Sequence, residues 1–142
     1  MIKLESIRTL RENDDIPDYH HIITELDLVK YCGAADDYSA PHWDHVYMVE
    51  HGFTGVIVHG WFTFAVMCRA VTNLASPEIC DISRYAVRYR RPTLPGALCC
   101  GGKVVRVRDE EGRAAVDLDL WAKDAAGNVT TTATMTLLAA LA

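Results

Sequence analysis

An acidic and an imidazole side chain, Asp37 and His42, lie five residues apart in the segment richest in ionisable and aromatic residues. The stretch between them contains Pro41 and lacks helical periodicity, so a loop can bring both side chains to one point. A carboxylate and an imidazole that share one water form a general base with an oriented partner. The same spacing also suits an alternative without chemistry, a turn capped by the aspartate beside a partly exposed histidine.

A second candidate is Gly60, which directly precedes a long apolar stretch with helical periodicity. The first backbone N–H groups of a helix have no partner within the helix, and they can bind negative charge that develops on an oxygen. Gly60 would equally serve to let the chain pack tightly as it enters the helix.

A metal centre and an anion-binding patch are weaker candidates. Five possible metal ligands fall within 18 residues, but their spacing matches no HExxH pattern and no thiolate motif joins them; they are His42, Asp44, His45, His51 and His59. We therefore expect no metal. Strand alternation puts Arg88 and Arg90 on one face, which is either solvated or a patch for phosphate groups.

Length and composition limit the elements that can position these residues. The chain has 142 residues, of which 50% are hydrophobic and 23% charged, as expected for one globular domain over 1–142. A net charge of −5 argues against a nucleic-acid partner. No apolar run is long enough to span a membrane, the first residues lack the core of a signal peptide, and the five cysteines form no CxxC pair. We expect a cytoplasmic protein.

The first half of the chain predicts helices and a long irregular segment. Residues 1–18 are polar and are expected to be a lead-in segment. Thr24 and Asp27 predict the capped start of a helix over 25–32, which Gly33 would end. Residues 33–58 are expected to be mostly irregular, with a helical turn near 44–50, and 60–75 to be a helix that is apolar almost all round and therefore buried.

The second half alternates polar and apolar residues with a period of two. This pattern predicts antiparallel strands over 85–90, 105–108, 116–120 and 132–137, joined in part by hairpins at 109–112 and 125–128. A sheet with one wet face needs a cover on its other face, and the buried helix supplies it. The predicted class is α+β, with a curved antiparallel sheet wrapped around one long central helix.

Taken in order, these segments resemble the MaoC-like family of (R)-specific enoyl-CoA hydratases and 3-hydroxyacyl dehydratases. The similar stretches are YCGAADDYSAPHWD (31–44), GFTGVIVHG (52–60) and YAVRYRRPTLPG (85–96). The resemblance implies a hot-dog fold, and it assigns the motif's acid to Asp37, its histidine to His42 and the N–H donor for the thioester oxygen to Gly60. The family usually has asparagine at the position of Ser39 and smaller residues near Trp61.

The activity that the resemblance implies is reversible hydration of a trans-2-enoyl thioester, carried by CoA or an acyl carrier protein, to the (R)-3-hydroxyacyl thioester. It requires neither metal nor redox cofactor. The expected assembly is a homodimer, or a heterodimer with a second hot-dog chain. Further candidates for substrate contact are Ser39, His59, Trp61, Arg88 and Arg90.

Two other functions stay open at this stage. A non-catalytic or acyl-binding subunit of a heteromeric dehydratase would share the same fold. A hot-dog acyl-CoA thioesterase is the other, but such enzymes usually place an acidic residue on the central helix, and residues 60–75 contain no Asp or Glu.

Overall fold

A single sheet and three α-helices make up most of the part that the computed structural model describes, residues 7–75 and 79–140. In chain order the elements are η1 (Ile7–Thr9), β1 (Asp15–Ile23), α1 (Glu25–Ala35), η2 (Ala40–His42), α2 (His45–Glu50), α3 (Gly60–Leu74), β2 (Cys80–Tyr89), β3 (Gly96–Glu110), β4 (Arg113–Lys123) and β5 (Val129–Ala139). Across these two ranges, every helix is too short or too polar to cross a membrane.

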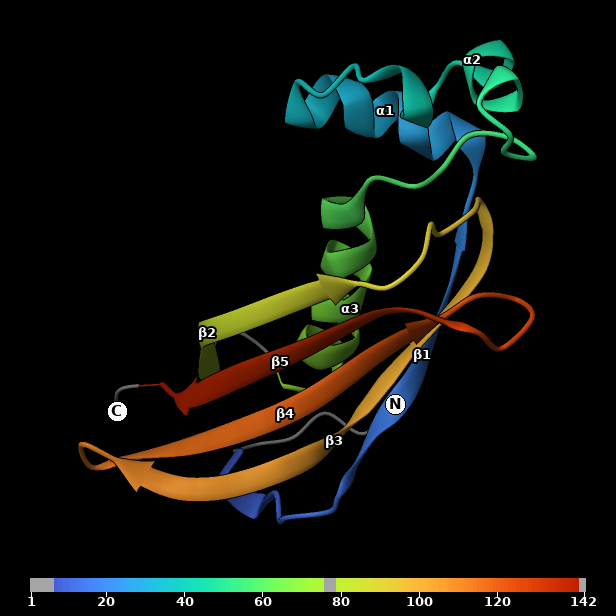
Figure 1. The fold of residues 1–142 in the computed structure, drawn as a ribbon. Helices are drawn as coiled ribbons and strands as arrows, with labels where there is room; N and C mark the ends of the chain where they lie inside the picture. The colour runs from blue at the N-terminus through green and yellow to red at the C-terminus, as the bar shows by residue number, and fades with distance from the viewer. Residues whose placement is uncertain (1–6, 76–78, 141–142) are drawn as a thin grey trace.

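The five strands form one antiparallel sheet in the order β1-β3-β4-β5-β2. The sheet curves around α3, as Figure 1 shows. The predicted meander of three strands is confirmed as β3, β4 and β5. Strand β1 is not predicted by the sequence pattern, and it begins at Asp15 inside the expected lead-in segment, whose first six residues lie outside the described ranges. Its polar composition suits an edge strand, which has water along one side.

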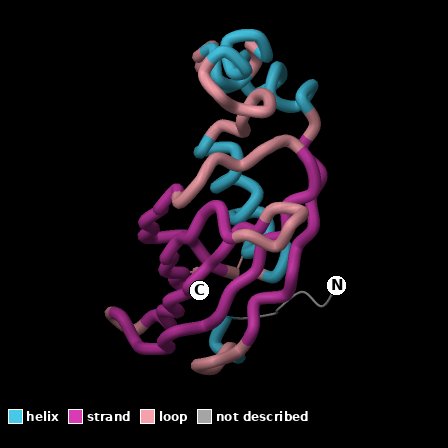
Figure 2. The backbone as a smooth tube through the Cα atoms, turned by 45° about the vertical axis from the view of Figure 1, so that its right-hand side comes forward, coloured by secondary structure: helices cyan, strands magenta, loops and turns pink. Residues whose placement is uncertain are grey.

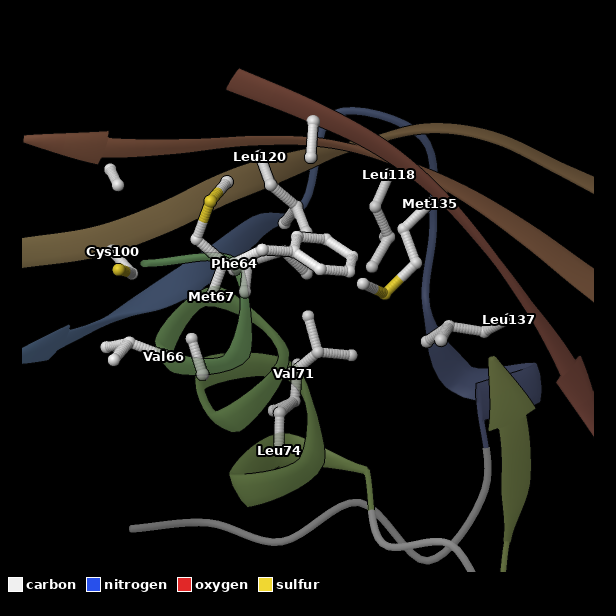
Figure 3. Close-up of a cluster of buried hydrophobic side chains, with 14 of the residues drawn as sticks. Phe64, Val66, Met67, Val71, Leu74, Cys100, Leu118, Leu120, Met135 and Leu137 are labelled. Carbon is white, nitrogen blue, oxygen red and sulfur yellow. The ribbon is translucent and has the colours of Figure 1, made fainter. Parts of the chain in front are cut away.

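Helix α3 supplies the cover for the inner face of the sheet. Its side chains Phe64, Met67 and Val71 point into the core against Leu118 and Met135 (Figure 3). Burying such side chains stabilises the fold by about 1.5–3 kcal/mol each. The prediction of a helix buried all round is wrong on one side, because Trp61 is 58% exposed. The apolar face of α3 therefore exceeds what the sheet of one chain covers.

Helix α1 begins with the predicted cap and ends later than predicted. The Asp27 backbone N–H donates to Thr24 Oγ1 at 3.2 Å, and the Thr24 N–H donates to Asp27 Oδ2 at 3.0 Å, which completes a capping box. Gly33 lies inside the helix rather than after it. The left-handed residue that ends α1 is Asp36, with φ 52° and ψ 35°. Aspartate is one of the few non-glycine residues that tolerate this conformation.

Strand β3 departs from the predicted alternation at one point. The register between β3 and β4 shifts between Val104 and Arg106. Val105, expected to face the core, is 50% exposed, while Val104 is buried. An extra residue of this kind is a β-bulge, which reverses the side on which the following residues lie.

Helices α1 and α2 lie together beyond the N-terminal end of α3, away from most of the sheet (Figures 1 and 2). The Asp44 carboxylate caps α2 by accepting from the Tyr47 N–H at 2.9 Å, so the predicted helical turn near 44–50 is confirmed. The chain then descends from α2 to Gly60 and enters α3 (Figure 1). This route places residues 36–44 and the start of α3 at the same end of the molecule.

Candidate active site

The carboxylate of Asp37 is held by the residue two positions later. Its Oδ1 accepts from the Ser39 hydroxyl at 2.6 Å and from the Ser39 backbone N–H at 3.2 Å. The Ser39 side chain and then its backbone N–H lower the pKa of Asp37, because both hydrogen bonds favour the charged form. Asp37 therefore lies in the site as a fixed carboxylate, with Oδ2 left to face His42.

The imidazole of His42 faces that carboxylate, with 4.0 Å between Asp37 Oδ2 and His42 Nε2. On the far side of the ring, Nδ1 lies 2.8 Å from the carbonyl oxygen of Ile57. A carbonyl can only accept, so Nδ1 carries the proton and, in the neutral ring, Nε2 keeps its lone pair. The Ile57 N–H donates to the Pro41 carbonyl at 2.9 Å. These two bonds tie the His42 loop to the segment that leads into α3.

His59 lies directly beneath His42. The two rings stack with centroids 3.6 Å apart and an interplanar angle of 20°. His59 is only 2% exposed, and its Nε2 lies 3.6 Å from Cys32 Sγ and 3.4 Å from the Asp37 carbonyl oxygen. Burial lowers the pKa of His59, and the adjacent His42 lowers it further. His59 is therefore a buried support for the His42 ring rather than an exposed contact for substrate.

Gly60 begins α3, and its N-cap residue His59 makes no side-chain capping hydrogen bond. The first-turn N–H groups of the helix are thus not capped by that side chain, and the helix dipole adds partial positive charge there. The ring of Tyr89 packs against Gly60 so closely that a Cβ at position 60 would lie 2.7 Å from Tyr89 Cζ. The absence of a side chain at Gly60 is what lets the Tyr89 ring lie this close to the start of α3.

A cavity of about 540 Å³ opens beside these groups. His42 and Gly60 line it together with backbone and side chains from the start of α3 and from the segment that follows β2. The other lining residues are Ile57, Val58, Trp61, Thr63, Tyr89, Arg90, Arg91, Pro92 and Thr93. Its volume suits a small organic ligand.

The structure brings together only some of the residues that the sequence predicts. Asp37, His42 and Gly60 gather at one end of α3, Ser39 holds Asp37, and Trp61 and Arg90 line the cavity. Arg88 does not line it. That side chain lies along a groove on the outer face of the sheet, beside Thr132 and Thr134. Arg90 borders this groove as well as the cavity, and its Nε donates to Thr132 Oγ1 at 3.2 Å. Another member of the basic run, Arg84, is paired elsewhere, because it donates to both carboxylate oxygens of Glu110.

Sequence reasoning does not find three parts of this site. The Ile57 carbonyl that fixes the His42 tautomer is a backbone group, and any residue at that position carries one. Tyr89 lies on a strand with an alternating pattern, and this pattern does not distinguish Tyr89 from the other residues of the strand as a site residue. Thr93 holds the entry to α3, because its carbonyl accepts from the Val58 N–H at 2.8 Å. None of these three has a signal in residue type or spacing.

Three of the side chains could in principle hold a metal ion, since donor atoms of Asp37, His42 and His59 lie within 4.8 Å of one another. The stacking of the two imidazoles argues against it. A ring nitrogen binds a metal in the plane of its ring at about 2.0–2.1 Å. One ion cannot meet this condition for two nearly parallel rings whose centroids are 3.6 Å apart. Two of the other possible ligands make different contacts: Asp44 caps α2, and His51 Nδ1 lies 2.7 Å from the Tyr47 carbonyl oxygen.

The match to a family model establishes what class of protein this is. The model of the MaoC like domain matches residues 12–122, and the chain belongs to this family of hydratases and dehydratases. No curated protein matches the chain.

Solved structures with the same fold include proteins of this class. The unliganded R-hydratase PhaJ1 from Pseudomonas aeruginosa is similar with a TM-score of 0.82 and 20% identity, over 93% of this chain and 83% of that one. The (R)-hydratase from A. caviae involved in PHA biosynthesis has a TM-score of 0.82 and 13% sequence identity, over 92% of this chain and 97% of the matched chain. The ChsH1–ChsH2 complex from Mycobacterium tuberculosis has a TM-score of 0.80 and 20% sequence identity, over 92% of this chain and 98% of the matched chain. These likenesses confirm the hot-dog fold.

Proposed function

We propose that this protein hydrates trans-2-enoyl thioesters to (R)-3-hydroxyacyl thioesters, and catalyses the reverse dehydration, with Asp37 and His42 as the catalytic pair. The observation that carries the proposal is the 4.0 Å separation of Asp37 Oδ2 and His42 Nε2 beside the start of α3. A water about 2.8 Å from each atom fits between them. Membership of a hydratase and dehydratase family supports the reaction class.

The hydration step follows from the protonation states of the pair. The carboxylate of Asp37 accepts a hydrogen bond from the water and orients it, and the lone pair on His42 Nε2 takes the second proton as the oxygen bonds to C3. The electron pair of the C2–C3 double bond moves toward the thioester carbonyl, giving an enolate-like state. The His42 imidazolium then gives the proton it took to C2, so that H and OH from one water have been added across the double bond and the imidazole is neutral again.

The start of α3 stabilises the negative charge that develops on the thioester oxygen. The backbone N–H of Gly60 is the proposed donor, because it lies at the positive end of the helix and next to the cavity that His42 lines. A donor aimed at such an oxygen is typically worth about 10²–10³ in rate. No step in this scheme calls for a metal or redox cofactor.

The CoA or acyl-carrier-protein part of the substrate would extend out of the cavity beside two arginine side chains. Arg90 and Arg91 both line it, and guanidinium groups bind phosphate oxygens well. CoA and the phosphopantetheine arm of an acyl carrier protein both present phosphate, so this feature suits either carrier.

The test is the hydration of crotonyl-CoA and longer enoyl-CoA thioesters by purified protein. We expect Asp37→Asn and His42→Ala each to lower kcat by at least about 10²-fold with little loss of stability, because both side chains act on the water. Two neighbours provide matched controls. Asp36→Asn changes the adjacent acid, which ends α1, and His45→Ala changes an exposed histidine three residues on.

Near-wild-type turnover in either of the Asp37 and His42 variants would remove the basis for this pair. Release of free thiol without hydration would instead favour a thioesterase.

We further propose that the working form is a dimer, of two copies or with a second hot-dog chain. Trp61, Phe64 and Tyr85 form an aromatic cluster at the edge of the sheet, with Phe64 and Tyr85 ring centroids 4.9 Å apart. Trp61 and Tyr85 are more than half exposed in the single chain. Aromatic side chains exposed at a sheet edge are typical of protein interfaces. Trp61 also lines the cavity, so assembly would complete one wall of the site.

A further inference from the structure

A second cluster of chemically reactive side chains lies on the edge of the sheet formed by β1 and β3. Asp18 and His20 are two residues apart on β1, and Cys99 pairs directly with His20 across the two strands. The carboxylate, imidazole and thiol donor atoms all lie within 4.8 Å of one another. None of the three residues lines the cavity beside His42 and Gly60. The cluster is therefore separate from the proposed catalytic pair.

The distances in this cluster are close to those of a metal site. Cys99 Sγ and His20 Nε2 are 4.0 Å apart. In a tetrahedral zinc site with Zn–S of about 2.3 Å and Zn–N of about 2.0–2.1 Å, ligand atoms lie about 3.5 Å apart. Small side-chain rotations close this difference, and all three side chains are at least partly exposed and free to make them.

The backbone next to the cluster leaves room for the carboxylate. Gly101 lies two residues beyond Cys99 on β3, and a Cβ at position 101 would be 2.6 Å from Asp18 Oδ1. The same Cβ would be 2.6 Å from Trp121 Cζ2. A glycine at this position is thus what lets Asp18 lean over β3 toward Cys99.

The kind of donor atom selects the ion. A thiolate, an imidazole and one carboxylate form a borderline set that favours Zn²⁺ and similar transition metals over Mg²⁺ and Ca²⁺, which prefer oxygen donors. We propose that Asp18, His20 and Cys99 form a binding site for a divalent transition metal of the zinc class. Three protein ligands leave a fourth position for water or another donor.

A cation lies next to Cys99 on the neighbouring strand β4. Lys123 pairs with Cys99 across β3 and β4, and its Nζ lies 3.9 Å from the centre of the Trp121 ring. A divalent cation adjacent to Asp18 reverses the local field, and the thiol proton is released when sulfur binds the metal.

A metal ion at this site would cross-link the edge strand β1 to its neighbour β3. Strand β1 has a neighbour on one side only, β3, and its register shifts between Ile16 and Tyr19. Two ligands on β1 and one on β3 would cross-link the strands next to this irregularity. Because an ion bound only to the folded form stabilises it, we expect the melting temperature to rise with added metal.

The test uses purified, tag-free protein titrated with Co²⁺ and followed by absorption. Bound cobalt reports a thiolate ligand through a charge-transfer band and a tetrahedral site through intense visible bands. Zn²⁺ should displace the cobalt and raise the melting temperature. We expect Cys99→Ser to abolish the charge-transfer band and His20→Ala to weaken Co²⁺ binding at least about tenfold, since even outer-shell changes cost about 10–100-fold.

Matched variants separate this site from the other histidines and thiols. Cys68→Ser removes a partly buried thiol on α3, and His21→Ala removes the next histidine on β1; both should bind Co²⁺ like the parent protein. The metal-free melting temperature of each variant shows whether its fold is intact.

Absence of a charge-transfer band in the parent protein would overturn the proposal. A band that survives Cys99→Ser would do the same, and so would binding that is lost in His42→Ala but kept in His20→Ala, because the ion would then lie in the catalytic cluster. Enoyl-CoA hydration is measured in parallel. We expect Cys99→Ser to leave the hydration rate unchanged. The metal site and the hydratase activity are therefore tested independently.

Discussion

Each member of the proposed catalytic pair is adjusted by a group outside the pair. Ser39 holds Asp37 in its charged form, and the Ile57 carbonyl holds the proton of His42 on Nδ1. His59 closes the far face of the His42 ring. The proposed chemistry thus depends on three supporting residues, of which two act through backbone position or stacking rather than through reactive groups.

Replacing Ser39 with alanine isolates the first of these supports. The Ser39 side chain contributes the largest effect that lowers the Asp37 pKa, through its 2.6 Å hydrogen bond. Removing a donor that favours the carboxylate makes the charged form less favourable, so the pKa of Asp37 should rise toward its ordinary value. The measurement is an NMR titration of the Asp37 side-chain carboxyl carbon in Ser39→Ala and in the parent protein.

Ser83→Ala is the matched control for this titration, because the Ser83 hydroxyl donates to the Thr136 carbonyl on the sheet and not to Asp37. An Asp37 pKa that stays where it is in Ser39→Ala would show that the backbone N–H alone fixes the charge. The role assigned to the serine hydroxyl would then be wrong.

At the scale of elements, two glycines have different structural roles, one in helix α1 and one in strand β3. Gly33 lies inside α1, where a Cβ would meet only the Tyr38 hydroxyl at 3.8 Å, which is ordinary contact. Gly102 lies on β3 where a Cβ would be 2.3 Å from the Asp119 backbone oxygen and 2.7 Å from Leu120 Cδ2. The first glycine only weakens its helix, whereas the second lets two strands approach.

Alanine at these two glycines should therefore change stability in opposite directions. Gly33→Ala should stabilise the protein by about 0.5–1 kcal/mol, because glycine costs that much in a helix interior. Gly102→Ala should destabilise it by about 2–3 kcal/mol, because neither a strand backbone nor a packed leucine can move aside freely. Urea unfolding measures both, and equal effects of the same sign would contradict this account of β3.

The sequence predicts these elements well where one face is dry and the other wet. Alternation identifies β4 and β5 because Leu118, Leu120 and Met135 are buried on one side. It fails at Val105, where a bulge shifts the register, and it misses β1, where Asp15, Asp18 and His20 face water along an edge. Bulges and edges depend on which strand lies alongside, and local periodicity does not contain that information.

The candidate site shows the same limit. The five-residue spacing predicts that Asp37 and His42 converge, and the helix start predicts where Gly60 lies. The spacing of residues does not say how deeply each side chain is buried. His59 is therefore predicted as a substrate contact, although it is buried under His42. Arg88 is likewise assigned to the site, although its strand carries it to the outer face.

At the scale of the whole molecule, one edge of the sheet exposes aromatic side chains. Strand β2 is at the end of the sheet, and Tyr85 and Trp61 meet there edge to face with ring centroids 6.4 Å apart. Helix α3 exposes apolar surface at the same place. A partner covering this edge would bury both aromatic rings, each worth about 1.5 kcal/mol or more in free energy.

Tyr85→Glu tests this view of the assembly. The parent chain has a mass of 15.8 kDa, and by light scattering we expect about twice that value in solution. A carboxylate at position 85 would have to lose its water inside an apolar interface, so the variant should be monomeric at the same concentration. Its hydration rate should fall together with its mass, because Trp61 belongs both to this edge and to the cavity.

Val105→Glu is the matched control, since Val105 is also an exposed apolar residue of the sheet but lies on β3, two strands from β5 and away from β2. It should remain dimeric and active. A Tyr85→Glu protein that stays dimeric would place the interface elsewhere. A parent chain that is monomeric, and that hydrates enoyl-CoA only when a second hot-dog chain is added, would mean that the aromatic edge is shaped for a different partner rather than for its own copy.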